Sequence, residues 1–252
     1  MKRLFLLLAL LFSASLLAQA PEPMPLAHGN TPGEPHHHLK IENEYVRVYY
    51  VEVPPHENTQ LHQHDHDYLF VTLGDSDVIN AVRDKPEVHL ILKDGETHFT
   101  HGGFAHVARN LSDKPFRNVT IELLHPQDDA HNLCQMIVPG ELGPCSKKDV
   151  GTPGYIDEPL FETQEVRAEL ISLQPRAKFV QRVPFGCLYV ALDSAELQDA
   201  PGKPALKLQP GDRFWVPAAT ILKLQNVAPS KARYLLLTIR RGALRTKTEG
   251  AS

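Results

Sequence analysis

The sequence predicts an all-β protein made of two similar barrels or sandwiches in tandem, and three observations lead to this prediction. Short β-branched and aromatic runs are separated by turn-forming clusters such as Pro54-Pro55 and Asp94-Gly95. No long stretch has helical periodicity. Segments of the first half also recur in the second half in the same order, which indicates an internal duplication.

The repeated segments keep a nearly constant spacing of 120, 119 and 116 positions. The matching pairs are Ile41–Arg47 with Phe161–Arg167, Tyr68–Leu73 with Cys187–Leu192, and Gly95–Asn110 with Gly211–Asn226. Chance similarity between two strand-rich sequences is the alternative, but three matches in one order favour duplication.

The first 20 residues have the three parts of a secretory signal peptide. Lys2 and Arg3 form a basic start, a leucine-rich apolar run follows, and small residues end the segment at Ala20. We therefore expect cleavage near Ala20 and a periplasmic or secreted protein that leaves the membrane once it is cleaved. A retained membrane anchor is the alternative.

The mature chain then divides by composition. Residues 21–40 are rich in Pro, Gly and His and predict a disordered leader. The cluster His36-His37-His38 within it could bind metal loosely, but a solvated tail is the better interpretation. Residues 41–124 carry strand-like runs and predict the first barrel. Further expected segments are a Pro- and Gly-rich linker over 125–158, the second barrel over 159–242 and a tail over 243–252. Strands are expected at 45–53, 68–73, 78–82, 88–92 and 118–124.

Charge and cysteine content limit the class of protein. Without Lys2 and Arg3 the chain has 24 basic and 30 acidic residues, a net charge of −6, which argues against nucleic acid or an anionic membrane as a partner. Cys134 and Cys145 flank a Pro- and Gly-rich loop and could form a disulfide in an oxidising compartment, or remain two free thiols.

Histidines point to a metal site in the first half. All 14 of them lie at or before His131. In an extended strand His62, His64 and His66 share one face at roughly 7 Å spacing, so two imidazoles can converge on one ion. A glycine-bounded turn delivers His106 into a second strand, where it can face the first group if the barrel closes. A solvated polar strand is the competing interpretation.

The histidine-rich segments Leu61–Tyr68 and Gly95–Asn110 resemble the two motifs of the cupin superfamily. His62, His64 and Gly74 match the first motif. The second motif is matched by Gly95, Gly103, His106 and Asn110, with His101 in the position of the family's proline. The resemblance covers about Ile41 to Leu124 and, more weakly, Phe161 to Arg241. It implies double-stranded β-helix (jelly-roll) barrels arranged in tandem as in a bicupin.

The resemblance also implies the ligands. His62, His64 and His106 would hold one divalent transition metal, with iron or manganese favoured and zinc or nickel as alternatives. Where the family usually places a glutamate ligand, this sequence has Tyr68 or Leu69. Tyr68, His66 and His101 are candidates for a fourth ligand or for a supporting position, as is His98.

The C-terminal copy departs from the motifs. It has Leu222 in the position of the second-motif histidine and no histidine near Gln181 and Val183, so it should bind no metal. A structural role is the better interpretation of this half, either in pairing the two barrels or in forming a homodimer.

The resemblance to cupins leads to three hypotheses for function. The leading one is a small-molecule metalloenzyme of the dioxygenase type, because some cupins that resemble thiol dioxygenases hold iron with three histidines. The alternative is a non-catalytic protein that binds a small molecule or the metal itself, and a relic without metal is the third reading. The sequence does not identify the substrate.

Overall fold

The computed structural model describes residues 31–145, 148–149 and 153–240. Within these residues the chain forms strands β1 to β20 and one short 3₁₀ helix, η1 (Thr31–Gly33), which confirms the predicted all-β class. No helix in this part of the chain is long and apolar enough to cross a membrane. The predicted signal peptide and C-terminal tail lie outside the described residues.

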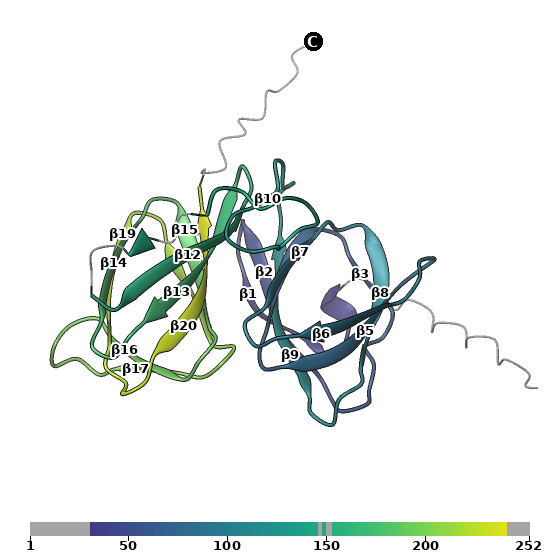
Figure 1. Ribbon diagram of the computed structural model, residues 1–252, viewed down its shortest axis with the longest axis horizontal. Helices are drawn as coiled ribbons and strands as arrows, with labels where there is room; N and C mark the ends of the chain where they lie inside the picture. The colour runs from purple at the N-terminus through teal and green to yellow at the C-terminus, as the bar shows by residue number, and fades with distance from the viewer. Residues whose placement is uncertain (1–30, 146–147, 150–152, 241–252) are drawn as a thin grey trace, which may run out of the picture.

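The N-terminal barrel consists of two antiparallel sheets that enclose a central space (Figure 1). One sheet has the strand order β1-β2-β9-β4-β7 and the other the order β3-β8-β5-β6. The strands are β1 (His37–Glu42), β2 (Val46–Val53), β3 (His62–His64), β4 (Asp67–Thr72), β5 (Ser76–Val82), β6 (Val88–Leu92), β7 (Thr97–Thr100), β8 (Phe104–Asn110) and β9 (Phe116–Leu123).

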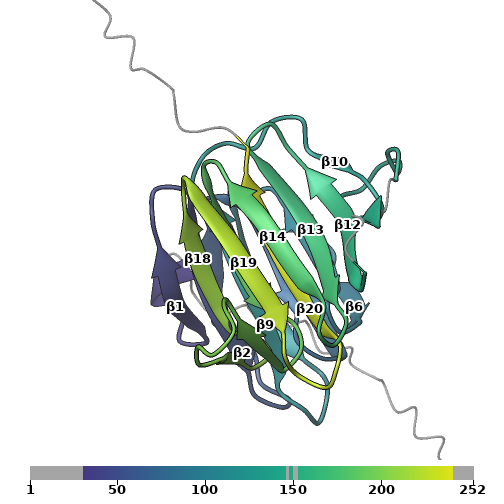
Figure 2. The same cartoon turned by 90° about the vertical axis from the view of Figure 1, so that its left-hand side faces the viewer.

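The C-terminal barrel repeats this topology strand for strand. Strands β14 and β19 of its smaller sheet face the viewer in Figure 2. Its sheets have the orders β12-β13-β20-β15-β18 and β14-β19-β16-β17, and β10 (His131–Asn132) and β11 (Lys148–Asp149) both pair with β12. The strands are β12 (Tyr155–Glu162), β13 (Val166–Leu173), β14 (Lys178–Val183), β15 (Gly186–Ala191), β16 (Ala195–Gln198), β17 (Leu206–Leu208), β18 (Arg213–Pro217), β19 (Thr220–Asn226) and β20 (Ala232–Ile239).

Details of the two barrels agree with the duplication. The β1–β2 pair shifts register between Leu39 and Ile41, and the β12–β13 pair does so between Pro159 and Phe161. Asn110 donates from its amide to three backbone carbonyls beyond its own strand, and Asn226 does the same at the matching position. The second-motif asparagine is therefore a structural residue that holds a loop in each barrel.

The largest buried apolar cluster lies between the barrels. The outer faces of β2, β4 and β9 pack against those of β13, β15 and β20, so these sheets are buried on both faces. Phe99 and Phe161 meet in this interface with ring centroids 4.9 Å apart. At its edge Arg233 pairs with Asp94 at 2.6 Å. The C-terminal barrel therefore covers an apolar surface of the N-terminal one.

Two segments differ in the structure from what the sequence predicted, namely the leader over 21–40 and the linker over 125–158. The disordered leader is corrected over its described part, because residues 31–40 form η1 and most of β1, and Thr31 and Glu34 are buried. The reason is that β1 pairs along β2 from His37 to Glu42. The predicted linker also contains structure. Cys134 and Cys145 form a disulfide within it, and β12 begins at Tyr155.

Candidate metal centre

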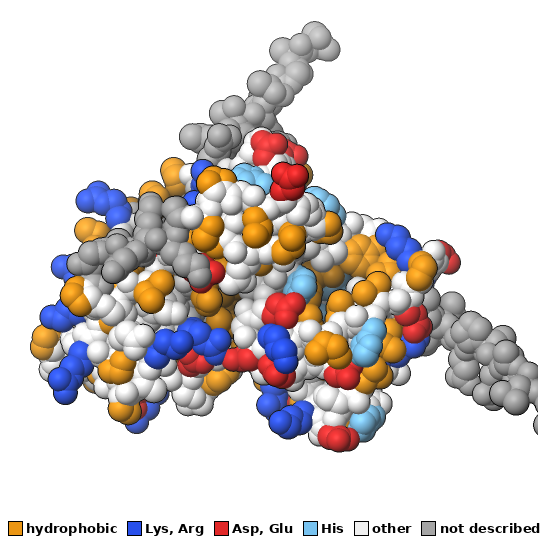
Figure 3. All heavy atoms as spheres, viewed as in Figure 1, with side chains coloured by type: hydrophobic (Ala, Val, Ile, Leu, Met, Phe, Trp, Pro, Cys, Tyr) orange, Lys and Arg blue, Asp and Glu red, His pale blue; other side chains and the backbone are white. Residues whose placement is uncertain are grey.

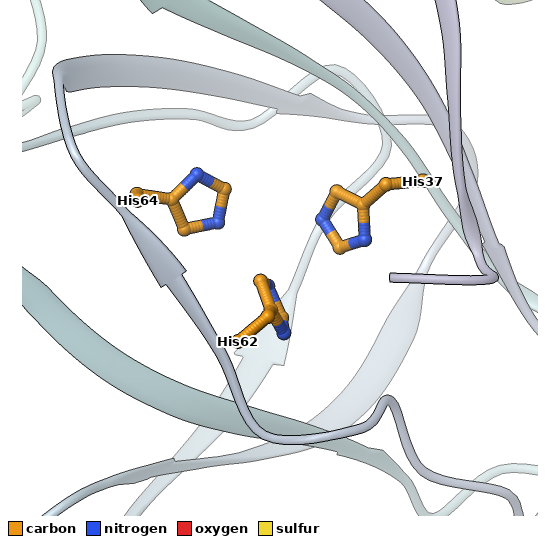
Figure 4. A group of neighbouring side chains, drawn as sticks. All are labelled: His37, His62 and His64. Carbon is orange, nitrogen blue, oxygen red and sulfur yellow. The ribbon is translucent and has the colours of Figure 1, made fainter. Parts of the chain in front are cut away.

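Four histidine side chains converge inside the N-terminal barrel. His62 and His106 are directly paired residues of β3 and β8, and His64 lies two positions further along β3 on the same face. His37 enters from β1 in the opposite sheet. One ring nitrogen from each of His37, His62 and His64 lies within 4.8 Å of the others, and Figure 4 shows these rings facing a common space.

His106 joins this group through His62. Their Nε2 atoms lie 3.1 Å apart, and the centroid of the His106 ring is 5.3 Å from that of His64. His62 and His64 are almost fully buried, with 2% and 1% of their surface exposed. The structure thus brings together the three histidines predicted from the motifs and adds His37.

An oxygen acceptor lies next to the Nδ1 atom of every histidine in the group. The acceptors are Glu34 Oε2 for His37 at 2.6 Å, the Gln60 carbonyl for His62 at 2.8 Å, Glu122 Oε1 for His64 at 3.1 Å and Asn80 Oδ1 for His106 at 2.7 Å. These oxygen atoms can only accept a hydrogen bond, so the Nδ1 atom of each ring must donate one and carries the proton. The Nε2 atom of each neutral ring then presents a lone pair. This arrangement is typical of histidines that ligate a metal.

The protonation states also suit metal binding. Burial lowers the pKa of His62 to about 3, and repulsion from His37 and His64 adds to the effect. Burial also lowers the pKa of His37 below the usual value for histidine. It lowers the pKa of His106 further, well below that value. Neutral imidazoles are therefore the stable form at neutral pH, and only this form binds a metal ion.

The two carboxylates beside the group are ionised. Burial alone would raise the pKa of Glu34, but hydrogen bonds from His37 and His36 outweigh it and bring the pKa to about 2. Burial opposes ionisation of Glu122 as well, and the hydrogen bond from His64 lowers its pKa.

The distance between His62 and His106 fits one ion between them. Two nitrogen ligands each at about 2.0–2.1 Å from one ion, at angles of about 90–110°, lie about 2.9–3.4 Å apart. The observed separation of the two Nε2 atoms is 3.1 Å. Two lone pairs at this distance repel each other unless a cation or a proton lies between them. The residues present therefore fit a first-row transition metal.

The other predicted site residues lie at the edge of this group or outside it. Tyr68 is buried, and its ring stacks on that of His64 with centroids 4.2 Å apart. Burial raises the pKa of Tyr68, so its hydroxyl stays protonated and suits a hydrogen-bond donor. His98 stacks on Phe70, and its Nε2 lies 2.8 Å from a carboxylate oxygen of Glu96.

His66 and His101 do not join the four histidines. Strand β3 ends at His64, so the alternation that would bring His66 to the same face stops there. The His101 side chain is 69% exposed, and its Nδ1 lies 3.3 Å from Asp67. Their predicted role as spare ligands has no support in this geometry.

His37 was missed because the composition around it resembles a flexible tail. The repeat contained a signal for it, since a strand over Tyr155–Glu162 in the second copy implies one before and around Ile41 in the first. The acceptor Glu34, three positions before His37, is a second signal.

The four histidines line one end of a partly open chamber with a volume of about 150 Å³. The chamber is lined mostly by apolar side chains, namely Val51, Phe70, Val78, Leu90, Leu92, Ala108 and Phe116. Its further polar groups besides Tyr68 and His98 are Thr59, Asn80, Thr100, Asn118 and Thr120. Such a chamber can hold a small molecule next to an ion.

The matching place in the C-terminal barrel is filled. Gln181 and Leu222 pair across β14 and β19 as His62 and His106 pair in the first barrel. Gln181 accepts a hydrogen bond from the Tyr189 hydroxyl, and the Tyr189 ring stacks on Phe214. On the face shown in Figure 3, histidine side chains are visible over the N-terminal barrel and at the top of the molecule, near β10.

Comparisons with known proteins found relatives by structure. No protein family and no characterised protein matches the sequence. AerE from Microcystis aeruginosa is similar with a TM-score of 0.57 and 10% identity, over 82% of this chain and 99% of that chain. Salicylate 1,2-dioxygenase from Pseudoaminobacter salicylatoxidans, solved as adducts with gentisate, has a TM-score of 0.55 and 13% identity, over 77% and 68%. A glyoxylate-induced protein from Pseudomonas aeruginosa has a TM-score of 0.57 and 13% identity, over 80% and 77%. The likeness concerns the fold.

Proposed function

Starting from its tandem cupin-type jelly-roll fold, we propose that this chain is a metalloenzyme of the dioxygenase type that acts on a small molecule. The observation that carries the proposal is the set of four imidazoles whose Nδ1 atoms are all held by acceptors, so that each Nε2 is free for an ion. The similar salicylate 1,2-dioxygenase, with its gentisate adducts, supports the reaction class.

His37, His62, His64 and His106 would hold one divalent ion, with iron or manganese favoured over zinc or nickel. Such an ion supplies Lewis acidity and, for iron or manganese, redox chemistry towards oxygen. The protein contributes the rest. Tyr68 offers a protonated hydroxyl close to His64, and the apolar walls of the chamber can contact a bound substrate.

We also propose that the protein is exported. The signal-peptide pattern of residues 1–20 supports this location, and the disulfide between Cys134 and Cys145 suits an oxidising compartment. Detection of the mature chain in the periplasm or medium, with its N-terminus near Pro21, would test the proposal. A full-length chain retained in the cytoplasm would contradict it.

Oxygen uptake tests the enzymatic proposal. Iron-loaded protein would be given a panel of thiols, phenols and diketones, and we expect at least one to be consumed together with oxygen. The matched control is the His106→Ala variant treated in the same way, which should consume none. Equilibrium dialysis that shows binding without turnover by the wild-type protein would instead favour the alternative, a non-catalytic binding protein.

A further inference from the structure

An asparagine in the wall of the chamber has an unused hydrogen-bond donor. Asn118 lies on β9, is 5% exposed and lines the chamber. The hydroxyl of Thr120 donates to Asn118 Oδ1 at 2.8 Å, so the carbonyl end of the amide points along the strand. Within the described part of the chain, Asn118 Nδ2 donates no hydrogen bond. Because the side chain lines the chamber, these N–H groups are available to a molecule inside it.

The neighbours of Asn118 in the chamber wall are apolar. Its cross-strand partner on β2 is Val51, and the next residue on the same face of β9 is Phe116. Both side chains line the chamber, and neither can accept a hydrogen bond. Buried polar groups in proteins nearly always have a partner, so an amide left free in an apolar wall points to a partner that enters the chamber.

Asn118 does not belong to the histidine group. The group meets β9 at Glu122, which contacts His64 Nδ1 at 3.1 Å. Asn118 lies four residues before Glu122 on the same face of β9, about 13 Å away along the strand, with Thr120 between them. The acceptors of the four histidines are other residues. A molecule held at the ion would therefore present a different part of itself to Asn118.

We propose that the carboxamide of Asn118 binds the substrate at a point away from the ion and selects a molecule with a hydrogen-bond acceptor there. This inference rests on the proposed function, because it takes the other end of the substrate to be held by the metal. The substrate class is a mainly apolar molecule. It has an oxygen or sulfur donor for the ion at one end and an oxygen acceptor, such as a carbonyl or an ether, towards Asn118.

The chamber size limits this molecule to about one ring. The volume is about 150 Å³. An apolar protein cavity of about this size holds one benzene molecule. Because the chamber is partly open, a ring with one short substituent fits, which corresponds to roughly ten heavy atoms.

Two phenols provide a matched pair of probes. The compounds para-methoxymethylphenol and para-propylphenol share the head that binds the ion and have nearly the same shape, but only the first has an ether oxygen in its side chain. Calorimetry on the zinc-loaded full chain would give the dissociation constant of each. The quantity of interest is the constant for the propyl compound divided by that for the methoxymethyl compound, because differences common to both phenols cancel in this ratio.

Replacing Asn118 should lower the ratio. We expect it to fall about three- to tenfold in Asn118→Leu and in Asn118→Ala, since one neutral hydrogen bond changes an affinity by about this factor. Thr97→Val is the matched control. It removes a buried hydroxyl that donates to the Gly95 carbonyl and does not line the chamber, so the ratio should change less than about twofold.

A second measurement needs only the wild-type chain. In zinc-loaded protein labelled with the heavy nitrogen isotope, the side-chain amide protons of Asn118 should move downfield in the magnetic resonance spectrum when para-methoxymethylphenol binds. They should not do so with para-propylphenol. This result is independent of whether either Asn118 variant folds.

Three results in a zinc-loaded chain would overturn the inference: no binding of either phenol, an unchanged ratio in both Asn118 variants, or no downfield shift with para-methoxymethylphenol. Zinc content separates these results from a failure of the proposed function. The three results refute the role of Asn118 and leave the metal site standing, whereas a wild-type chain that takes up no zinc refutes the metal site and this inference with it.

Discussion

His62 and His106 face each other across the β3–β8 pair with their Nε2 atoms 3.1 Å apart. Each ring has its Nδ1 proton directed to an oxygen, from Gln60 and Asn80 respectively. Neither Nε2 atom therefore carries a proton that it could donate to the other ring. A shared ion resolves this contact.

Removing either member of this pair should abolish stable metal binding. We expect His62→Ala and His106→Ala proteins to retain less than a tenth of the metal of the wild type after dialysis, measured by elemental analysis. The matched controls are His66→Ala and His101→Ala, which should retain it in full because these side chains lie outside the group. Full metal content in both ligand variants would refute the site.

Asn80 should strengthen metal binding by holding the ring of His106 in place. Asn80→Ala removes the acceptor at His106 Nδ1 and frees the ring to rotate, so metal affinity should fall about 10–100-fold. Competition with a chelator of known affinity measures this change. Asn118→Ala is the control, since Asn118 also lines the chamber but accepts its hydrogen bond from Thr120. Equal affinities in the two variants would contradict a positioning role.

His37 should be a ligand although it lies in the segment first expected to be disordered. His37→Ala should weaken metal binding at least tenfold, whereas His38→Ala, on its exposed neighbour, should not. A chain that starts at Ile41 lacks Thr31, Glu34 and His37 together and should bind metal no better than the His37→Ala protein. Wild-type affinity of that shortened chain would show that β1 is dispensable.

The metal-free protein should lose stability as the pH falls. The pKa of His62 is about 3 in the folded chain against an ordinary value of 6.5, so the unfolded chain binds more protons between these values. The contribution to the free energy of unfolding is complete above pH 6.5 and decreases steadily below it. Urea unfolding in the presence of a chelator at pH 7.5, 6.5, 5.5 and 4.5 would show the decline. His62→Ala should have a shallower one, and a wild-type stability that is constant across this range would contradict the assignment.

Pairing of the barrels should contribute substantially to stability. Phe161 is fully buried between them, and Phe161→Ala should lower the free energy of unfolding by about 3–5 kcal/mol. Ile221, 55% exposed on β19, provides the control, because Ile221→Ala should change it by about 0.5 kcal/mol or less. Similar effects in both variants, from denaturant titrations, would argue against a structural role for this interface.

The sequence predicted the parts of this molecule that local pattern determines. Runs of β-branched and aromatic residues bounded by turn residues predicted the strands, and the repeat predicted two barrels, whose sheets have the same strand order. The motif spacing predicted His62, His64 and His106 as ligands, and the structure places these three side chains close together. The spacing also identified Gln181 and Leu222 as replacements in the second copy, and their cross-strand pairing agrees.

The parts it could not predict depend on contacts between distant strands. Glu122 reaches His64 only because β9 pairs with β4 in the sheet opposite β3. His37 and Glu34 are in place because β1 adds to the edge of β2, a pairing that the composition of residues 21–40 conceals. His66 shows the converse, since a pattern of alternate histidines overstates the length of β3.

The most direct test of the shared metal site is a crystal structure of the metal-loaded protein with anomalous diffraction data collected at the absorption edge of the bound metal. We expect one peak per chain, within about 2.0–2.3 Å of the Nε2 atoms of His37, His62, His64 and His106, and none in the C-terminal barrel. A peak elsewhere, or none between these histidines at full occupancy of the metal in solution, would contradict it.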